Sequence, residues 1–279
     1  MKFTKMHGLG NDFIFVDYFK TEIPDLDFSG LAIDLCDRNF GIGADGLVLV
    51  LASNAADARM RIFNPDGSEP EMCGNAIRCF AKYLYDRGLV LDNPLTVETL
   101  RGVLTLEMQV EGGLVESVKV DMGEPILKPE HIPTTGTGDM VLNYPLIVDG
   151  KEFFVTAVSM GNPHCITFVE NASAVNLKEI GPKVETHDFF PRNTNVEFVQ
   201  VVDRGHVMMR VWERGAGPTL ACGTGACATA VACVLNDKTN RKVKVTVPGG
   251  DLFIEWGEDN HVHMTGPATE VFTGEITLF

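Results

Sequence analysis

Two short segments of the sequence each place a cysteine directly before a glycine and a helix-forming run. They are "EMCGNAIRCFAKYLY" at 71–85 and "TLACGTGACATAVACVL" at 219–235, and the leading cysteines are Cys73 and Cys222. The first turn of a helix has backbone N–H groups without partners and a partial positive charge. Both features favour thiolate over thiol, so the position predicts a lowered cysteine pKa. The same N–H groups can hold a carboxylate, and the glycine lets the backbone approach it closely.

Two such sulfurs facing one substrate would suit the inversion of a carbon centre. One thiolate removes a proton from one face, and the opposing thiol delivers a proton to the other. The two thiols would titrate as a coupled pair, one charged and one neutral. Charge that develops on the substrate carboxylate needs preorganised donors. The expected donors are the backbone N–H groups of Gly74, Asn75, Gly223 and Thr224. No lysine lies in a recognisable pyridoxal-phosphate context, so we expect no cofactor.

Composition and charge limit the classes of protein to consider. The chain has 279 residues, 45% of them hydrophobic, and a net charge of −15. Hydrophobic content of this size is typical of a globular protein, and the negative charge disfavours nucleic acids and anionic membranes as partners. No apolar run reaches membrane-spanning length, and the N-terminus does not have the order of a signal peptide. We therefore expect a cytoplasmic protein.

The remaining cysteines, and two motifs elsewhere, do not indicate further sites. An odd number of cysteines without a secretion signal argues against a disulfide framework, and no C-x-x-C pair suggests zinc. The "GIGADG" at 41–46 matches a dinucleotide pattern but lies between a helix-like segment and a strand, the reverse of that fingerprint. The "HVH" at 261–263 has no third ligand nearby, so we expect no metal site. The cysteines expected to pack as small buried hydrophobes are Cys36, Cys79, Cys165, Cys227 and Cys233.

Strand-like segments outnumber helices, which predicts an α+β fold. Several segments alternate polar and apolar residues, as half-buried antiparallel strands do. Helices are expected at 29–38, with Ser29 as a possible N-cap, at 75–88 and at 225–237. The last is apolar on nearly every face and must be surrounded by protein. The expected strands are 47–51, 58–63, 103–110, 115–122, 153–160, 165–170, 195–202, 206–213, 242–247, 251–256 and 261–266.

A faint internal repeat indicates two halves of similar build. Asn64 lies nine residues before Cys73, and Glu213 lies nine residues before Cys222. We expect each half to be a curved, mostly antiparallel sheet wrapped around a central helix, with the active site in the cleft between the halves. The turn-rich stretch near 122–133 suggests the joint. The expected domains are 1–121, completed by a C-terminal strand at 267–279, and 122–266.

Four of these segments together resemble one known family. "KMHGLGNDFIFVD", "FNPDGSEPEMCGNAIRCFA", "SMGNPHC" and "ERGAGPTLACGTGACA" are similar, in order across almost the whole chain, to segments of the diaminopimelate epimerases. The resemblance implies a cofactor-independent isomerase that interconverts LL- and meso-2,6-diaminoheptanedioate in lysine and peptidoglycan precursor synthesis. It also implies halves related by a pseudo-twofold axis, an amino dicarboxylate as substrate and a homodimer.

The resemblance assigns roles to individual residues. Cys73 and Cys222 match the acid–base pair, and His164 and Glu213 match the pair that modulates their pKa values. The matches to substrate-binding residues are Asn11, Asn64, Asn162, Asn195, Glu213 and Arg214, beside the backbone at 74–75 and 223–224. Gly46 departs from the pattern, because some relatives carry a glutamine there that touches substrate.

Simpler interpretations of the same residues remain open at this point. Asn64 in "NPDG" would also shape a turn, and His164 after a proline would also be an ordinary loop histidine. Glu213 and Arg214 would also form a surface ion pair worth under about 1 kcal/mol.

Three other functions compete with the epimerase hypothesis. A proline or hydroxyproline racemase-like enzyme, or another small-acid isomerase, would keep the fold and change the substrate. A cysteine hydrolase would need only Cys222, His164 and an asparagine. A redox sensor would join Cys73 and Cys222 in a regulatory disulfide.

Overall fold

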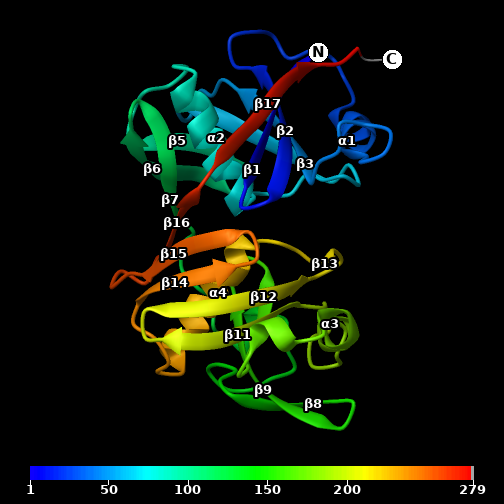
Figure 1. Ribbon diagram of the computed structural model, residues 1–279, viewed down its shortest axis with the longest axis vertical. Coiled ribbons are helices and arrows are strands. Elements are labelled where there is room, and N and C mark those ends of the chain that lie inside the picture. The colour runs from blue at the N-terminus through cyan, green and yellow to red at the C-terminus, as the bar shows by residue number, and fades with distance from the viewer. Residues whose placement is uncertain (278–279) are drawn as a thin grey trace. The chain divides into compact units, whose positions relative to one another are not determined.

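The computed structural model describes residues 1–277 and divides into two compact units. The first unit comprises Met1–Asp121 together with the segment that begins at Thr265, and the second comprises Met122–Met264. The chain leaves the first unit at the start of the turn-rich stretch near 122–133. It returns within β16 (Val262–Pro267), two residues before the expected boundary. Figure 1 shows both units and labels their elements.

The first unit is one sheet with two crossover helices. Its strands lie in the order β17, β1, β2, β3, β4, β5, β6, β7, and neighbours are antiparallel except β2–β3 and β4–β5. Parallel neighbours need a crossover connection, which α1 (Phe28–Cys36) and α2 (Gly74–Asp86) supply. The strand bounds are β17 Thr269–Glu275, β1 Lys2–Gly8, β2 Asn11–Tyr18, β3 Gly46–Leu51, β4 Ala58–Phe63, β5 Leu95–Thr99, β6 Gly102–Glu111 and β7 Leu114–Asp121.

The second unit repeats this arrangement. Its strands lie in the order β8, β9, β10, β11, β12, β14, β15, with β10–β11 and β12–β14 parallel and the other neighbours antiparallel. The crossovers contain α3 (Leu177–Glu185) and α4 (Gly223–Leu235). The strand bounds are β8 Tyr144–Val148, β9 Lys151–Ser159, β10 Pro163–Phe168, β11 Asn195–Asp203, β12 His206–Glu213, β13 Gly217–Pro218, β14 Lys242–Val247 and β15 Gly250–Trp256; short 3₁₀ helices span Pro129–His131 and Ala172–Ala174.

The strand registers relate the two units residue by residue. In the first unit β2 pairs Phe13 with Gly46 of β3, and in the second β10 pairs His164 with Asn195 of β11. The next strand continues the match, because Leu47 pairs with Phe63 and Val196 pairs with Trp212. The resulting equivalent positions are Asn11 and Asn162, Phe13 and His164, Gly46 and Asn195, Val48 and Glu197, Asn64 and Glu213, and Cys73 and Cys222.

The helix α4 is enclosed by the sheet of its own unit, as its uniform apolar character predicts. It contacts β9, β10, β11, β12, β14 and β15, and most of its side chains are buried. Its alanines, cysteines and threonines are small, so the strands approach it closely. Figure 1 shows the strands of the second unit crossing in front of this helix. The sheet and helix together position the residues at the N-terminal end of α4.

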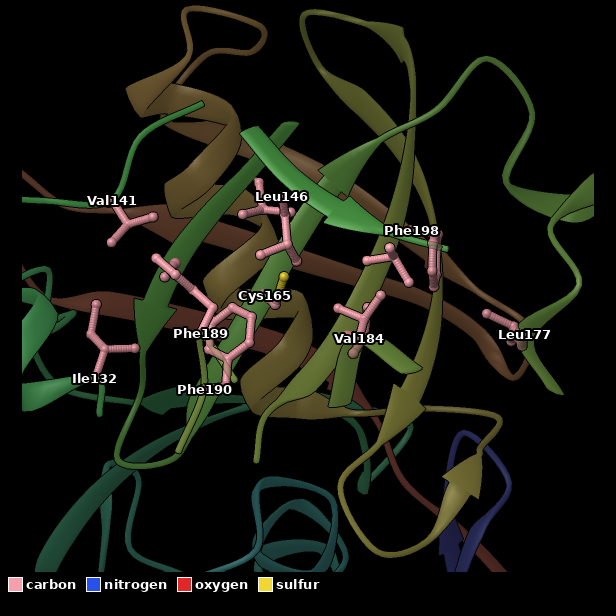
Figure 2. Close-up of a cluster of buried hydrophobic side chains, with 13 residues drawn as sticks. Ile132, Val141, Leu146, Cys165, Leu177, Val184, Phe189, Phe190 and Phe198 are labelled. Atoms are coloured by element: carbon pink, nitrogen blue, oxygen red, sulfur yellow. The ribbon is translucent and has the colours of Figure 1, made fainter. Parts of the chain in front are cut away.

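The opposite face of the same sheet packs on a second hydrophobic cluster. Figure 2 shows Cys165 of β10 and Phe198 of β11 in this cluster, with Val184 of α3 and the neighbouring Phe189 and Phe190. Successive side chains of a strand point to opposite faces. His164 and Glu197, which alternate with Cys165 and Phe198, therefore face α4.

The sequence predicted the three helices and eleven strands within two residues of their observed ends, but it missed other elements. The helix α3 was missed because it contains Gly181 and Pro182. A Cβ on Gly181 would lie 2.5 Å from Cδ2 of Trp212, so glycine permits the close approach of the helix to β12. Ser29 is not an N-cap: Asp27 holds that position, and the Ser29 hydroxyl donates a hydrogen bond to the Gly67 carbonyl at 2.7 Å.

Candidate functional site

In the first unit, Cys73 lies at the N-terminal end of α2. Its backbone is extended, with φ −133° and ψ 119°, and it caps a helix that begins at Gly74. The Cys73 carbonyl accepts the first helical hydrogen bond, from the N–H of Ile77 at 3.0 Å. Its Sγ lies 3.9 Å from Oδ1 of Asn11, and the residue is half-buried. The Cys73 sulfur and the backbone N–H groups of Gly74 and Asn75 therefore lie at the same helix entrance.

The amide of Asn11 is held in one orientation. Its Nδ2 donates to the Asp45 carboxylate at 2.7 Å, and its Oδ1 accepts from Nδ2 of Asn75 at 3.0 Å. The other Asp45 oxygen accepts from Arg38 at 2.7 Å. Because a carboxylate only accepts, the NH2 group of Asn11 must face Asp45, and the carbonyl oxygen of Asn11 is the atom that faces Cys73.

Behind Asn11, a compact ion cluster supports the strand end. Lys5 is buried, and its Nζ lies 2.6 Å from Oδ2 of Asp12, while Arg38 donates to Oδ1 of Asp12 at 2.7 Å. Burial alone would raise the pKa of Asp12, but the hydrogen bonds from Arg38 and Lys5 lower it below its ordinary value. Asp12 therefore stays ionised and anchors the segment that carries Asn11.

A fully buried arginine lies beneath the first turn of α2. The guanidinium of Arg78 donates to the Gly74 carbonyl at 2.9 Å and to the Pro267 carbonyl at 3.2 Å. Gly8 gives it room, since a Cβ there would lie 3.0 Å from Nη2 of Arg78. The helix entrance that carries Cys73 thus has a buried cation close by.

The two remaining candidates of the first unit lie at the ends of neighbouring strands. Asn64 follows β4 and closes a turn, donating from its N–H to the Ser68 carbonyl at 2.8 Å and from Nδ2 to the Ser68 hydroxyl at 2.9 Å. The turn-forming role expected for Asn64 is therefore present. A Cβ on Gly46 would lie 3.0 Å from the Phe63 carbonyl, so the backbone leaves little room for a side chain at that position.

In the second unit, Cys222 lies at the equivalent entrance, that of α4. Its backbone is extended, with φ −122° and ψ 110°, and its Sγ accepts a hydrogen bond from the N–H of Gly225 at 3.4 Å. The hydroxyl of Thr224 lies 3.6 Å from the same sulfur. Cys222 is 5% exposed, whereas Cys73 is half-buried. The two cysteines therefore have the same backbone position and different environments.

The pKa of Cys222 is raised, not lowered as its position at a helix entrance predicts. Burial raises the pKa of the Cys222 thiol well above its ordinary value, and the nearby carboxylates of Glu213 and Glu197 act in the same direction. The hydrogen bonds from Thr224 and Gly225 oppose this shift but do not outweigh it. Desolvation and two negative charges therefore exceed the partial positive charge of the helix end.

Glu213 and the residues near it form the polar environment of the Cys222 sulfur. Burial raises the pKa of Glu213, while hydrogen bonds from the hydroxyl of Thr219 and from Cys222 oppose that shift. Nδ2 of Asn195 donates to the Pro163 carbonyl at 2.8 Å, and its Oδ1 accepts from the N–H of Arg214 at 3.0 Å. The guanidinium of Arg214 is exposed and donates to the Arg192 carbonyl at 3.3 Å.

His164 belongs to a buried pair that sequence reasoning found only in part. Its Nδ1 lies 2.6 Å from Oε1 of Glu197, and its Nε2 lies 3.0 Å from Oδ1 of Asn162. The side chains of His164 and Glu197 are both fully buried. Glu197 was missed because a glutamate in a strand of alternating polar and apolar residues is usually predicted to face solvent. The available signal was its spacing of two from Asn195, which places both on one face.

The other cysteines are packing residues, as expected. The five cysteines outside the candidate pair are buried: Cys36, Cys79, Cys165, Cys227 and Cys233. Within residues 1–277, no helix is long and apolar enough to cross a membrane.

Comparison with known families decides the classification. The family model described as diaminopimelate epimerase matches residues 3–128 and 156–271. The chain belongs to this family. A diaminopimelate epimerase of Desulfitobacterium hafniense is 61% identical over 279 residues, covering 99% of this chain and 98% of that protein. One of Methanococcus maripaludis is 54% identical and covers both chains completely. The resemblance seen in the sequence motifs is confirmed.

Solved structures outside the diaminopimelate epimerase family share the fold. A Bacillus anthracis phenazine biosynthesis protein of the PhzF family matches all of this chain and 99% of its own, with a TM-score of 0.71 and 18% identity. A hydroxyproline epimerase from Agrobacterium vitis matches 99% of this chain and 90% of its own, with a TM-score of 0.70 and 15% identity. At these identities the likeness concerns the fold alone, and it confirms the expected α+β class.

Proposed function

We propose that this protein interconverts LL- and meso-diaminopimelate, using Cys73 and Cys222 as its two acid–base groups and no cofactor. The observation that carries the proposal is the equivalence of the two cysteines: each caps the central helix of its unit at the same register position. Family membership and identities of 54–61% to diaminopimelate epimerases support the substrate. In this proposal the two helix entrances lie on opposite sides of one substrate α-carbon.

The local environments suggest different resting states for the two sulfurs. The raised pKa of Cys222 supports a thiol there at neutral pH. Cys73 is more exposed and lies at a helix entrance, whose backbone N–H groups favour a thiolate. In one direction, Cys73 accepts the substrate's α-proton and becomes a thiol. Cys222 gives its proton to the opposite face of the carbanion and becomes a thiolate, so the proton count is conserved.

The remaining candidates supply binding. In this proposal the backbone N–H groups of the two first helical turns hold the reacting carboxylate while charge develops on it. The guanidinium of Arg214 is exposed and suits a bidentate contact with the distal carboxylate. Amide groups both donate and accept, so they suit an amino dicarboxylate. The amide side chains assigned this role are Asn11, Asn64, Asn162 and Asn195.

Turnover of the LL-substrate by purified variants tests the proposal. Wild-type protein should form the meso product, and Cys73→Ala and Cys222→Ala should each abolish it. Cys227→Ala is a matched control, because Cys227 is a buried packing residue of α4, and it should keep activity. Formation of the meso product by Cys73→Ala would contradict the use of two cysteines. The shared fold with a hydroxyproline epimerase makes that chemistry the second candidate, so proline and hydroxyproline are assayed in parallel.

Location and assembly belong to the same proposal. The family resemblance implies a homodimer, and the lack of a spanning helix among residues 1–277 agrees with a cytoplasmic enzyme. Light scattering on the eluting protein should give twice the chain mass of 30.5 kDa. A mass that stays at the monomer value across micromolar concentrations would contradict the dimer.

A further inference from the structure

The pair of His164 and Glu197 is a difference between two otherwise equivalent units. By strand register, their positions correspond to Phe13 and Val48 of the first unit, which are buried hydrophobic residues. The same sheet architecture therefore forms with an apolar pair at these positions. The polar pair in the second unit is therefore not needed to form the sheet, and we look for a chemical role for it.

The Glu197 carboxylate is buried at a cost that its contacts only partly offset. Oε1 meets Nδ1 of His164 at 2.6 Å, and both side chains are fully buried. Among the residues that the structure describes, Oε2 has no hydrogen-bond partner. A buried carboxylate oxygen without a partner is unfavourable, and such groups in native proteins call for an explanation.

The carboxylate lies next to the candidate catalytic sulfur of its unit. A Cβ on Gly225 would lie 2.7 Å from Oε1 of Glu197 and 3.2 Å from Sγ of Cys222. Both groups therefore flank the same glycine in the first turn of α4, and a side chain at 225 would collide with the carboxylate. The position of the glycine thus allows the His164–Glu197 pair to approach the helix entrance.

The charged groups around this point come from three strands. His164 lies on β10, Glu197 on β11 and Glu213 at the end of β12. Their charges shift the pKa of Glu213 or of Cys222. After burial, Glu213 and then Glu197 raise the pKa of Cys222. His164 and Glu197 shift the pKa of Glu213 in opposite directions. Glu197 is thus part of the electrostatic environment of Cys222 as well as the partner of His164.

We propose that Glu197 is a positioning residue of the reaction: its carboxylate accepts a hydrogen bond from the Nδ1–H of His164 and fixes the ring so that Nε2 points to Asn162. This inference rests on the proposed function. Glu197 itself touches no substrate and acts through His164. A carboxylate behind a histidine fixes both the orientation of the ring and the nitrogen that carries the proton.

Glu197→Gln tests this proposal with little change in shape. The kcat should fall by about 10- to 100-fold, by analogy with the loss of carboxylates that orient metal-ligating histidines. KM should stay within about twofold, because Glu197 makes no substrate contact. The Nδ1 proton of His164 should give a strongly deshielded NMR signal in the wild type and move upfield in Glu197→Gln. Glu98→Gln is the matched control: Glu98 of β5 is partly buried, bonded to Ser53, and should keep wild-type kcat.

A double-mutant cycle tests whether Glu197 acts through His164. In a His164→Asn background, the kcat loss from Glu197→Gln should be several-fold smaller than in wild type, because the ring it positions is gone and only its direct effect on the pKa of Cys222 remains. The variant His164→Phe/Glu197→Val copies the apolar pair of the first unit. It should unfold no more easily than wild type, since well-packed apolar residues of similar volume often replace a buried, partly satisfied polar pair without loss. Its kcat should nevertheless fall as far as that of His164→Asn.

Three outcomes would overturn the inference while leaving the proposed function intact. They are wild-type kcat in Glu197→Gln, equal losses from Glu197→Gln in both backgrounds, or full activity in His164→Phe/Glu197→Val. Failure of the proposed function would look different, because wild-type protein would then form no meso product at all.

Discussion

Replacing Gly225 by alanine should have a different effect from replacing Gly30, because Gly225 faces a buried, fixed carboxylate and Gly30 an exposed, movable one. Gly225 and Gly30 both lie in the first turn of a helix, α4 and α1, and a Cβ on either would lie 2.7 Å from a carboxylate oxygen. At Gly225 that oxygen belongs to Glu197, held by His164. At Gly30 it belongs to Asp27, which is exposed and free to rotate away.

The magnitudes follow from these environments. Replacing glycine by alanine within a helix gains up to about 1 kcal/mol from propensity alone. Overpacking a fixed site costs about 1–3 kcal/mol. Gly30→Ala should therefore stabilise the protein by up to about 1 kcal/mol, whereas Gly225→Ala should destabilise it by up to about 2 kcal/mol. Displacing Glu197 should also lower the kcat of Gly225→Ala, while Gly30→Ala should leave kcat unchanged.

Urea unfolding followed by circular dichroism measures the first difference, and the LL-to-meso assay measures the second. Melting temperatures should move in the same directions, by roughly 2–4 °C per kcal/mol. If Gly225→Ala is as stable and as active as Gly30→Ala, Glu197 does not occupy the space beside Cys222. The account of that carboxylate would then be wrong.

Three further predictions concern the thiols and the helix packing. The Glu213 carboxylate raises the pKa of Cys222, so Glu213→Gln should lower that pKa and speed alkylation of Cys222 at pH 8. Mass spectrometry of the Cys222 peptide measures the rate, and an unchanged rate would contradict this effect of Glu213. Burial raises the pKa of Cys79 to about 12. Because the unfolded chain ionises first, the stability that this thiol contributes is complete below about pH 9 and falls by about 1.4 kcal/mol per pH unit as the pH rises toward 12; Cys79→Ala should therefore flatten the alkaline fall in urea midpoint. Gly181→Ala would place a Cβ 2.5 Å from the ring of Trp212 and should destabilise the protein by about 1–3 kcal/mol in the same unfolding assay, and an unchanged midpoint would show that α3 can move away.

The sequence predicted the main helices and strands of this protein better than the contacts between them. The apolar run of α4 and the alternation of strands such as β12 depend on local periodicity, which a sequence displays directly. The helix α3 depends on a glycine that packs against Trp212, a contact made only after folding. Local propensity therefore pointed away from a helix there.

The same division applies to the candidate site. The two helix entrances were visible because a cysteine before a glycine and a helical run is a local pattern. Glu197 was not visible, because its role depends on which face of β11 meets α4 and on a partner 33 positions earlier in the chain. The raised pKa of Cys222 was also hidden, since it follows from burial and from carboxylates on other strands.

The central claim is that two cysteines serve one α-carbon from opposite faces. Epimerisation of the LL-substrate in deuterium oxide, stopped early and analysed by mass spectrometry, tests it most directly. Separate donor and acceptor thiols predict deuterium at the α-carbon of the meso product and almost none in the remaining LL-substrate, because the deuteron arrives from a different sulfur. Equal labelling of product and recovered substrate would show that a single base serves both faces, and the account would be contradicted.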